Sequence, residues 1–366
     1  MRVAIVTETF LPKMDGIVRT LLELLAYLKG NGHQALVVAA GPGPDEALGF
    51  RVARVAGVRF PLYPELTLSP LAPGLADELR AFRPDVVHLA GPCVLGAAAL
   101  HAARKLRLPT AAHFQTDIAG YARFFGFPWL APVLWGYLIA VHNRCLANYA
   151  PTETLAGELR RRGMRSVRVS GRGVDTQLFT PSRVVSCRHD MLYVGRVSPE
   201  KNIDWLIDLV DALPERRLRI VGDGPGRAAL ERRLEGRNVS FSGFLYGTDL
   251  AEAFASAKLF VFPSHTETFG QVVQEAMASG LPVVGVRSGG VADLVQPGET
   301  GLLSAPGDRR GFVEAARTLL SDTDSRQRMA SNARAFALQR TWNHVFDQLL
   351  LDYQQLSATS RSAEAA

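Results

Sequence analysis

The sequence has few cysteines and no long apolar segment. Its three cysteines, Cys93, Cys145 and Cys187, are far apart and form no Cys-x-x-Cys motif, which excludes a disulfide framework and a zinc cage. The longest stretch nearly free of charge, residues 128–141, has 14 residues and two prolines, whereas a helix that spans a bilayer needs about 20 apolar residues. The apolar run at the N-terminus is shorter than the core of a signal peptide. We therefore expect a protein of the reducing cytoplasm.

Positive charge is unevenly distributed over the 366 residues, a length typical of two domains. Residues 1–180 hold 20 Lys and Arg against 13 Asp and Glu, a net charge of +7. Residues 181–366 hold 21 against 22, a net charge of −1. A one-sided basic domain favours an anionic partner, either a nucleic acid or the cytoplasmic face of a membrane, although an Arg-rich soluble surface gives the same imbalance.

The first part of the chain alternates strand and helix patterns. A buried strand over residues 2–7 precedes a helix on which Val18, Leu21 and Leu25 recur at helical spacing, and a strand over residues 35–40 follows. Further strands are predicted at 85–89, 110–114, 146–150 and 167–170. This order favours a parallel sheet covered on both faces, and we predict a Rossmann-like domain over residues 1–175.

A second alternation follows a Gly-, Thr-, Pro- and Ser-rich stretch over residues 171–186, which we interpret as a linker. It predicts a second Rossmann-like domain over residues 186–340, followed by a C-terminal helix and polar tail over 341–366. Ligands of open α/β sheets bind beyond the C-terminal ends of the strands, so we expect a binding cleft there. The predicted strands are 191–194, 217–221, 239–242, 259–263 and 282–286, and the clearest helices are 203–213, 227–234 and 269–279.

The densest chemical cluster contains two glutamates eight residues apart, Glu267 and Glu275. Thr268 and Gln271 have capping-box spacing, which predicts a helix with Glu267 just outside its N-terminus and Glu275 two turns inside. Eight helical residues span about 12 Å, roughly the distance from a sugar hydroxyl to a ribose across a diphosphate. The free N–H groups between them suit an anion. Taken alone, such a pair is more often two solvated surface charges.

Cations and glycines elsewhere add to this interpretation. Residues 193–202 run from a strand into a turn that presents Arg196 and Lys201, and these two cations suffice to neutralise a diphosphate without a metal ion. Either one alone would be an ordinary surface cation. Gly16 directly precedes the first helix, where a missing side chain lets the backbone approach a phosphate, but a plain turn glycine explains it as well.

The segment Gly222-Asp-Gly-Pro-Gly226 raises the alternative of a dinucleotide-binding dehydrogenase. In the Gly-x-Gly-x-x-Gly fingerprint the third glycine would fall at Arg227, and no ribose-binding acid ends a following strand. The fingerprint therefore fails. We instead expect Gly222 in a turn beside a nucleotide, with Phe244 and Leu245 flanking the base.

At these motifs the sequence resembles the family 4 glycosyltransferases, which are retaining enzymes of the GT-B fold. The resemblance covers nearly the whole chain. It rests on the Glu-x7-Glu motif at Glu267 and Glu275, on Gly-Arg-x4-Lys at residues 195–201, and on Asp15-Gly16. It implies an α/β protein with two Rossmann-like domains that face a central cleft, the first binding the acceptor and the second binding a nucleotide sugar.

The resemblance also implies roles for individual residues. Arg196 and Lys201 would grip the diphosphate, Glu275 would take the ribose hydroxyls, and Gly16 would close over the phosphates. In the front-side displacement expected for the family, the leaving phosphate itself takes the acceptor proton. Neither a covalent nucleophile, a cofactor nor an obligatory metal ion is therefore expected. The transferred sugar would be held by Glu267 and by the backbone of Phe269, Gly270 and Gln271.

Three segments look most like one branch of the family. These segments, 113–117, 171–179 and 267–275, are most similar to bacterial GDP-mannose-dependent α-mannosyltransferases that act on glycolipids. Enzymes that make sulfoquinovosyl lipids look similar too. We therefore expect transfer of mannose from GDP-mannose onto a lipid-linked or amphiphilic acceptor. The alternatives are a UDP-sugar-dependent glycolipid glycosyltransferase of sulfoquinovosyl or glucosyl type and, with less support, a sugar-nucleotide epimerase.

His113 ends a predicted strand of the first domain, and the resemblance implies that it contacts the sugar or the reacting oxygen. Without the resemblance, a lone histidine at a strand end is more often a structural residue. Asp117 and Tyr121 are weaker candidates for the acceptor side, and Asp117 also suits a loop cap. Many relatives have a second histidine just after the position of His113, where this chain has Gln115.

An aromatic segment favours a membrane over a nucleic acid as the anionic partner. Residues 121–129 hold five aromatic rings and one Arg, and apolar residues 130–141 follow with Trp135 and Tyr137. Rings beside cations suit the headgroup boundary of a bilayer. Together with the net charge of +7, they predict that the first domain docks on the inner face of the cell membrane. A core helix preceded by a lid loop is the alternative.

Overall fold

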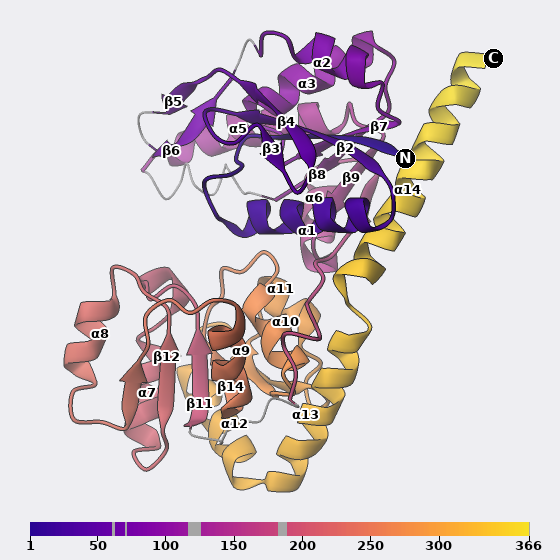
Figure 1. The fold of residues 1–366 in the computed structure, drawn as a ribbon. Coiled ribbons are helices and arrows are strands. Elements are labelled where there is room, and N and C mark those ends of the chain that lie inside the picture. The colour runs from indigo at the N-terminus through magenta and orange to yellow at the C-terminus, as the bar shows by residue number, and fades with distance from the viewer. Residues whose placement is uncertain (61–62, 70–71, 116–125, 182–188, 366) are drawn as a thin grey trace. The chain divides into compact units, whose positions relative to one another are not determined.

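The computed structural model describes residues 1–60, 63–69, 72–115, 126–181 and 189–365 (Figure 1). The chain divides into two compact units. Unit 1 contains Met1–Gly171 and Val345–Ala366, and unit 2 contains Arg172–His344. The C-terminal segment, which we expected to stand apart from both domains, thus belongs largely to unit 1.

Unit 1 is built on an eight-stranded sheet in the order β10-β9-β8-β7-β1-β2-β4-β3. Neighbouring strands are parallel except β3 and β4, which are antiparallel. A separate antiparallel hairpin joins β5 (Val58–Phe60) to β6 (Tyr63–Leu68). The sheet strands are β1 (Arg2–Thr7), β2 (Gln34–Ala40), β3 (Glu46–Ala47), β4 (Phe50–Val55), β7 (Val86–Ala90), β8 (Thr110–His113), β9 (Ala147–Ala150) and β10 (Val167–Val169).

Helices cover both faces of this sheet, with α2 and α3 on one side and α1 on the other (Figure 1). The residues of β1 after Arg2 are therefore all buried, as in strands that face a core on both sides. Asp15 caps α1 by accepting from the N–H groups of Ile17 and Val18, so Gly16 is the first helical residue. The helices are α1 (Gly16–Gly30), α2 (Leu75–Phe82), α3 (Val94–Lys105), the 3-10 turn η1 (Pro128–Leu130), α5 (Ala131–His142) and α6 (Glu153–Arg161).

Unit 2 is built on a six-stranded parallel sheet in the order β13-β12-β11-β14-β15-β16. All five strands predicted for this domain are present within two residues of the expected bounds. Only β16 was not predicted, because its four residues follow a Gly-Glu-Thr turn and show no periodicity. The strands are β11 (His189–Val194), β12 (Leu218–Val221), β13 (Val239–Phe241), β14 (Ala257–Phe262), β15 (Val283–Val286) and β16 (Gly301–Ser304).

The helices of unit 2 follow its strands, and the last helix leads back into unit 1. They are η2 (Pro199–Lys201), α7 (Trp205–Ala212), α8 (Arg227–Arg233), α9 (Gly247–Ala255), α10 (Gln271–Ala278), α11 (Gly289–Leu294), α12 (Arg309–Ser321) and α13 (Thr323–Leu338). The final helix, α14 (Trp342–Ala365), continues through the predicted polar tail.

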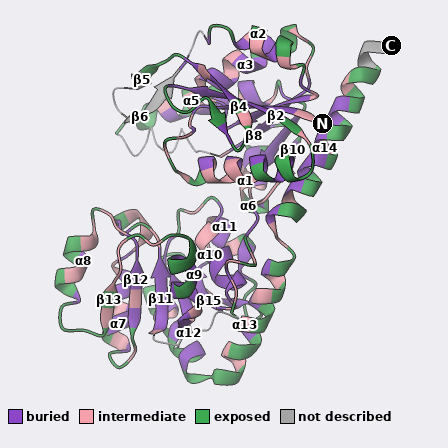
Figure 2. Cartoon of the chain, viewed as in Figure 1, coloured by how far each residue is buried: buried purple, intermediate pink, exposed green. Residues whose placement is uncertain are grey.

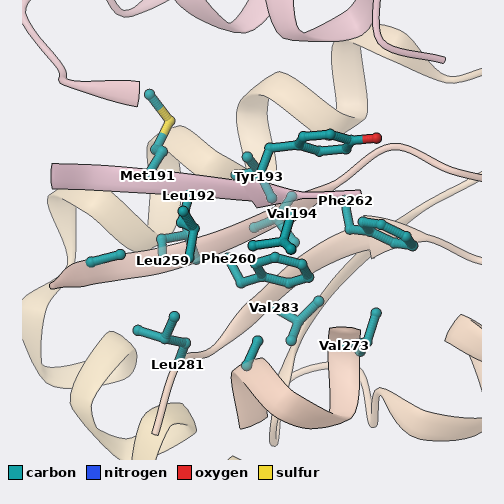
Figure 3. Close-up of a cluster of buried hydrophobic side chains, with 14 of the residues drawn as sticks. Met191, Leu192, Tyr193, Val194, Leu259, Phe260, Phe262, Val273, Leu281 and Val283 are labelled. Atoms are coloured by element: carbon teal, nitrogen blue, oxygen red, sulfur yellow. The ribbon is translucent and has the colours of Figure 1, made fainter. Parts of the chain in front are cut away.

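The core of unit 2 lies around its two central strands, β11 and β14. Figure 3 shows side chains of both strands packed against Val283 of β15 and Val273 of α10. The strands of both sheets are buried over most of their length (Figure 2). Burial of each large apolar side chain contributes about 1.5–3 kcal/mol. This rigid layer holds the loops that leave the C-terminal ends of the strands.

His88 in β7 and His142 at the end of α5 are two of the three buried histidines among the described residues of unit 1. Burial lowers the pKa of each from 6.5 to about 4. The Nδ1 atom of His142 lies 2.8 Å from Oδ1 of Asn148, and a carboxamide oxygen accepts hydrogen bonds only. His142 is therefore neutral with its proton on Nδ1 at ordinary pH.

Lowering the pH is expected to destabilise unit 1 through these histidines. Between their unfolded pKa of 6.5 and their folded pKa of about 4, the unfolded chain binds protons that the folded unit excludes. Their contribution is therefore complete above the unfolded pKa and declines as the pH falls, by about 1.4 kcal/mol per pH unit for each excluded proton. We expect His142→Gln to lose less stability than the wild type between about pH 7 and pH 5, as measured by urea denaturation.

His101→Gln provides the matched control, because His101 is an exposed histidine of α3 whose removal should leave the pH dependence of the wild type. If the free energy of unfolding of His142→Gln falls as steeply as that of the wild type, the assignment is wrong.

Candidate active site

A cavity of about 260 Å³ lies in unit 2, where β11 and β14 end and α10 begins. Three cations and one carboxylate belong to its wall, and the other lining residues are uncharged. Its lining residues are Arg172, Gly195, Arg196, Lys201, Phe262, Glu267, Thr268, Phe269, Gly270, Gln271 and Val272. The cavity therefore brings together six residues expected from the sequence: Arg196, Lys201, Glu267, Phe269, Gly270 and Gln271.

An ion pair between Lys201 and Glu267 forms part of the cavity wall. The Lys201 Nζ atom lies 2.6 Å from Oε1 of Glu267, and each side chain is 20% exposed. Ser264 donates a second hydrogen bond to the same oxygen, at 3.2 Å. The carboxylate is thus fixed by two neighbours, and the lysine keeps further N–H groups with which to bind an incoming anion.

Arg196 stands beside this pair as an exposed cation. A hydrogen bond fixes its backbone, because the hydroxyl of the buried Tyr193 donates to the carbonyl oxygen of Arg196 at 2.9 Å. An exposed guanidinium fork beside a lysine suits a diphosphate, which presents oxygens in two directions.

Gly222 is placed by a close backbone contact at this edge of the sheet. Its φ is +130°, and a Cβ atom would lie 1.9 Å from the carbonyl oxygen of Gly195. Its N–H donates to the carbonyl of Gly243 at 2.7 Å. Any side chain at position 222 would therefore push apart the loops that follow β11, β12 and β13, one of which carries Arg196.

Gly289 and Gly290 fix the Glu267 loop in the same way, and the sequence analysis missed them. A Cβ atom on Gly289 would lie 2.2 Å from the carbonyl oxygen of Glu267, and one on Gly290 would lie 2.2 Å from that of Phe269. The N–H of Gly290 also donates to the Glu267 carbonyl at 2.9 Å. The signal in the sequence was the glycine pair directly after a predicted strand and Ser288.

The predicted capping box at this helix is wrong. Helix α10 begins at Gln271 and not at Phe269, and its N-cap is Gly270, with φ of +92° and no side-chain cap. A residue in the left-handed conformation cannot belong to a helix, so Thr268 lies outside and lines the cavity instead. The side chain of Gln271 turns away from the cap and donates to the carbonyl of Gly173 at 2.9 Å.

The two glutamates of the Glu-x7-Glu motif have different surroundings. Glu267 lines the cavity, whereas Glu275 lies inside α10 and is only 1% exposed. The alternative of two solvated surface charges is therefore wrong, because Glu275 is buried. A buried carboxylate is costly unless it is paired or hydrogen-bonded. Glu275 is not among the lining residues, and its predicted contact with ribose stays a prediction.

Arg172 is the charged lining residue that the sequence analysis did not single out. It belongs to the stretch interpreted as a linker, yet its guanidinium lies 5.9 Å from the centre of the Phe269 ring. The neighbouring Gly173 packs against the backbone of Trp342, and Val174 forms a β-bridge with Thr341. The start of the predicted linker is thus a structural part of unit 2 and supplies a third cation.

The two residues expected to flank a nucleotide base, Phe244 and Leu245, have different surroundings in the structure. Phe244 is 59% exposed, but Leu245 packs against the core of unit 2. The partner of Phe244 is Tyr246, which is 74% exposed and stacks on it with ring centres 6.3 Å apart. Two exposed stacked rings are the arrangement on which a flat base packs, and Tyr246 replaces Leu245 in this interpretation.

In unit 1, His113 ends β8 and is 9% exposed. Its Nδ1 lies 2.8 Å from Nε2 of His88, and its ring stacks on Tyr149 with centres 4.8 Å apart. Gly16 opens α1. The two weaker acceptor-side candidates, Asp117 and Tyr121, lie outside the described residues.

Carboxylate and imidazole groups do not gather into a metal site among the described residues. One Asp-x-Asp sequence, the commonest metal motif of sugar transferases, does occur at Asp322-Thr-Asp324. Asp322 there caps α13 by accepting from the N–H of Ser325, far along the chain from the cavity. The charges in the cavity wall are those of side chains.

Two protein-family models match the chain. The family described as Glycosyltransferase Family 4 matches residues 14–178, and the one described as Glycosyl transferases group 1 matches residues 179–336. Together the two matches cover residues 14–336.

Curated relatives cover almost the full length. A GDP-mannose-dependent α-mannosyltransferase of Mycobacterium tuberculosis is 40% identical over 100% of this chain and 99% of its own. The enzyme of the same name from Corynebacterium glutamicum is 38% identical over 99% of this chain and 90% of its own. A sulfoquinovosyl transferase of Arabidopsis thaliana is 34% identical over 87% of this chain and 66% of its own.

Solved structures confirm the expected fold class. The Anabaena protein HepE, solved with UDP and glucose, matches with a TM-score of 0.76 at 23% identity, over 97% of this chain and 100% of its own. A sucrose-phosphate synthase from Thermosynechococcus elongatus also matches with a TM-score of 0.76, at 20% identity, over 98% of this chain and 99% of its own. Two parallel sheets in the GT-B arrangement of elements, matching family models and near-full-length relatives together establish that this chain is a glycosyltransferase that belongs to family 4.

Proposed function

We propose that this glycosyltransferase moves mannose from GDP-mannose, with retained anomeric configuration, onto a lipid-linked or amphiphilic acceptor. The observation that carries the proposal is the cavity of unit 2, in which Lys201, Glu267 and Arg196 stand together. The names of the relatives that are 38–40% identical support mannose and GDP.

The cavity supplies the charges that this transfer needs. Lys201 and Arg196 bind the diphosphate oxygens, while Glu267 accepts hydrogen bonds from sugar hydroxyls. As the bond between the sugar and the phosphate breaks, negative charge grows on the leaving phosphate. Fixed cations stabilise that charge more in the transition state than in the bound substrate, which lowers the barrier.

The proton balance of a front-side displacement needs no protein base. The acceptor oxygen forms a bond to the anomeric carbon on the face from which GDP leaves. The acceptor hydroxyl gives its proton to the departing phosphate oxygen, and the products are GDP and the glycosylated acceptor. With Arg172, Arg196 and Lys201 in the cavity wall, we propose that the side chains supply the required positive charge without an obligatory metal ion.

A UDP-sugar is the second candidate for the nucleotide. It is favoured by the 34% identical sulfoquinovosyl transferase and by a solved structure with UDP-glucose, which matches at 23% identity. Either base can stack on Phe244 and Tyr246, because every base has a flat apolar face. Stacking therefore does not distinguish guanine from uracil, and only contacts to the polar edge of the base can. Binding experiments with GDP and UDP decide between the two donors.

The acceptor side of the proposal includes docking on an anionic membrane. Helix α5 buries Trp135 and Leu138 but exposes Val133, and Trp129 before it is 70% exposed. Helix α5, predicted as either a docking surface or a core helix, thus has a buried face that packs in the core and an exposed apolar face. Among the described helices, none has both the length and the apolar character needed to cross a bilayer.

A groove of about 510 Å³ between α3 and α5 adds a basic rim to this apolar face. Its floor is Ala97, Leu100 and Val141, and its rim is formed by four basic residues. An apolar floor below a cationic rim suits an anionic lipid headgroup whose chains lie against the protein. We therefore propose that unit 1 places the enzyme on the inner face of the cell membrane. The rim residues are His101, Arg104, Lys105 and Arg144.

Removing the lysine of the cavity is expected to abolish most of the activity. Lys201→Ala should lower kcat/KM for GDP-mannose by about 30- to 1,000-fold, equivalent to about 2–4 kcal/mol of lost transition-state stabilisation. Steady-state kinetics measures this, with circular dichroism to check the fold. The control is Lys258→Ala, because Lys258 forms a similar pair with Asp190, at 2.8 Å, elsewhere in unit 2. Activity of Lys201→Ala within threefold of the wild type would refute the assignment.

GDP is expected to stabilise the protein more than UDP at equal concentration. A ligand at 100 times its dissociation constant stabilises the folded state by about 2.7 kcal/mol, which thermal-shift measurements detect. Replacing both Phe244 and Tyr246 by alanine should reduce the shift with either nucleotide. A larger shift with UDP would instead support a UDP-sugar, and equal shifts would remove the case for GDP.

Binding to anionic vesicles is expected to depend on the rim of the groove. The double change Arg104→Ala and Lys105→Ala should weaken the free energy of binding to the vesicles by about 2 kcal/mol, because each basic residue near the surface contributes about 1 kcal/mol. Co-sedimentation measures this binding. The same loss at the end of another helix, Arg232→Ala with Arg233→Ala in α8, serves as the control. Absence of wild-type binding at low salt, or equal losses in both variants, contradicts the docking surface.

A further inference from the structure

A continuous chain of hydrogen bonds in unit 1 links its last helix to the candidate residue His113. The hydroxyl of Tyr353 in α14 lies 2.8 Å from Nδ1 of His88 in β7. The other nitrogen of that ring, Nε2, lies 2.8 Å from Nδ1 of His113 in β8. Tyr353 is 265 residues from His88 in sequence, so only the return of α14 (yellow in Figure 1) to unit 1 creates this contact.

The hydrogens of this chain can be assigned by counting. Each contact needs one hydrogen, and Tyr353 is fully buried with His88 as its sole hydrogen-bond partner among the described residues. If Nδ1 of His88 carried a hydrogen, the tyrosine hydrogen would be buried without an acceptor, which native proteins avoid. Tyr353 therefore donates to His88.

The remaining hydrogens follow from that first assignment. His88 is neutral, because burial lowers its pKa from 6.5 to about 4, so it has one ring hydrogen. Since its Nδ1 accepts from Tyr353, that hydrogen is on Nε2 and is donated to Nδ1 of His113. Nδ1 of His113 is then an acceptor.

We infer that Tyr353 and His88 are positioning residues that hold His113 as the neutral Nε2–H tautomer, so that His113 acts on its ligand as a hydrogen-bond donor and not as a base. This inference rests on the proposed function for the role of His113 in transfer. An imidazole that presents N–H cannot take the proton of the acceptor hydroxyl. It can stabilise an oxygen that gains negative charge, which agrees with proton transfer to the leaving phosphate.

The tautomer itself can be read without substrate. In protein labelled with ¹⁵N-histidine, long-range ¹H–¹⁵N correlation spectra distinguish Nε2–H, Nδ1–H and doubly protonated rings. The His113 signal is assigned by its loss in His113→Gln. At about pH 7.5 we expect the Nε2–H pattern for both His113 and His88. An Nδ1–H or doubly protonated His113 in the wild type overturns the inference, whatever the variants do.

The role of Tyr353 is tested with Tyr353→Phe, which removes the hydroxyl and keeps the ring. We expect Nδ1–H signals to appear at His88 and His113, and kcat to fall by about five- to tenfold with KM for the nucleotide sugar within twofold. The matched control is Tyr149→Phe, because Tyr149 stacks on His113 but lies outside the chain of hydrogen bonds. Its tautomer pattern and kcat should stay within twofold of the wild type.

The outcomes separate this inference from the proposed function. If Tyr353→Phe keeps the wild-type tautomers, Tyr353 does not set them and the inference fails, while glycosyl transfer is untouched. If His113→Gln retains full activity although the wild-type tautomer is Nε2–H, the hydrogen assignment stands but the role of His113 in transfer is refuted.

Discussion

Close contact between backbones is the constraint on which the rest of the candidate site depends. The loops after β11, β12 and β13 meet at Gly195, Gly222 and Gly243, and the loop before α10 rests on Gly290. At Gly222 and Gly290 a single Cβ atom would overlap a neighbouring carbonyl. Because the sheet core beneath is packed solid, the loops have no room to retreat, and the backbone that carries Arg196 and Glu267 is therefore held in place.

Electrostatics then decides what this fixed frame can bind. The cavity wall contains Arg172, Arg196 and Lys201 but only Glu267 as an anion, so its net charge is positive. The Lys201–Glu267 pair adds little to stability, because the cost of removing both charges from water offsets most of their attraction. Its consequence is local: Glu267 keeps one oxygen occupied by lysine and leaves the other for sugar hydroxyls, which supports the proposed transfer of a hexose from a nucleoside diphosphate.

Helix α14 connects the chain's end to the interior of unit 1. Tyr27 of α1 donates a hydrogen bond to Asp347 and its ring contacts that of Phe346 at a tilted angle, while Tyr353 hydrogen-bonds His88. These contacts bury the helix against a unit whose other elements come from the first half of the sequence. A C-terminal truncation would thus remove a core element and, by the inference above, the group that sets the hydrogens of His113.

The sequence by itself determined the strands and helices with clear periodicity, the family, and residues whose spacing reflects one local turn, such as Arg196 with Lys201. Only the tertiary structure decided which of them meet. It moved the start of α10 to Gln271, placed Arg172 of the supposed linker in the cavity, turned Leu245 into the core and paired Phe244 with Tyr246. It also joined Tyr353 to His88. Periodicity reports burial along one element, whereas loop conformation and contacts between distant segments depend on packing that no local pattern records.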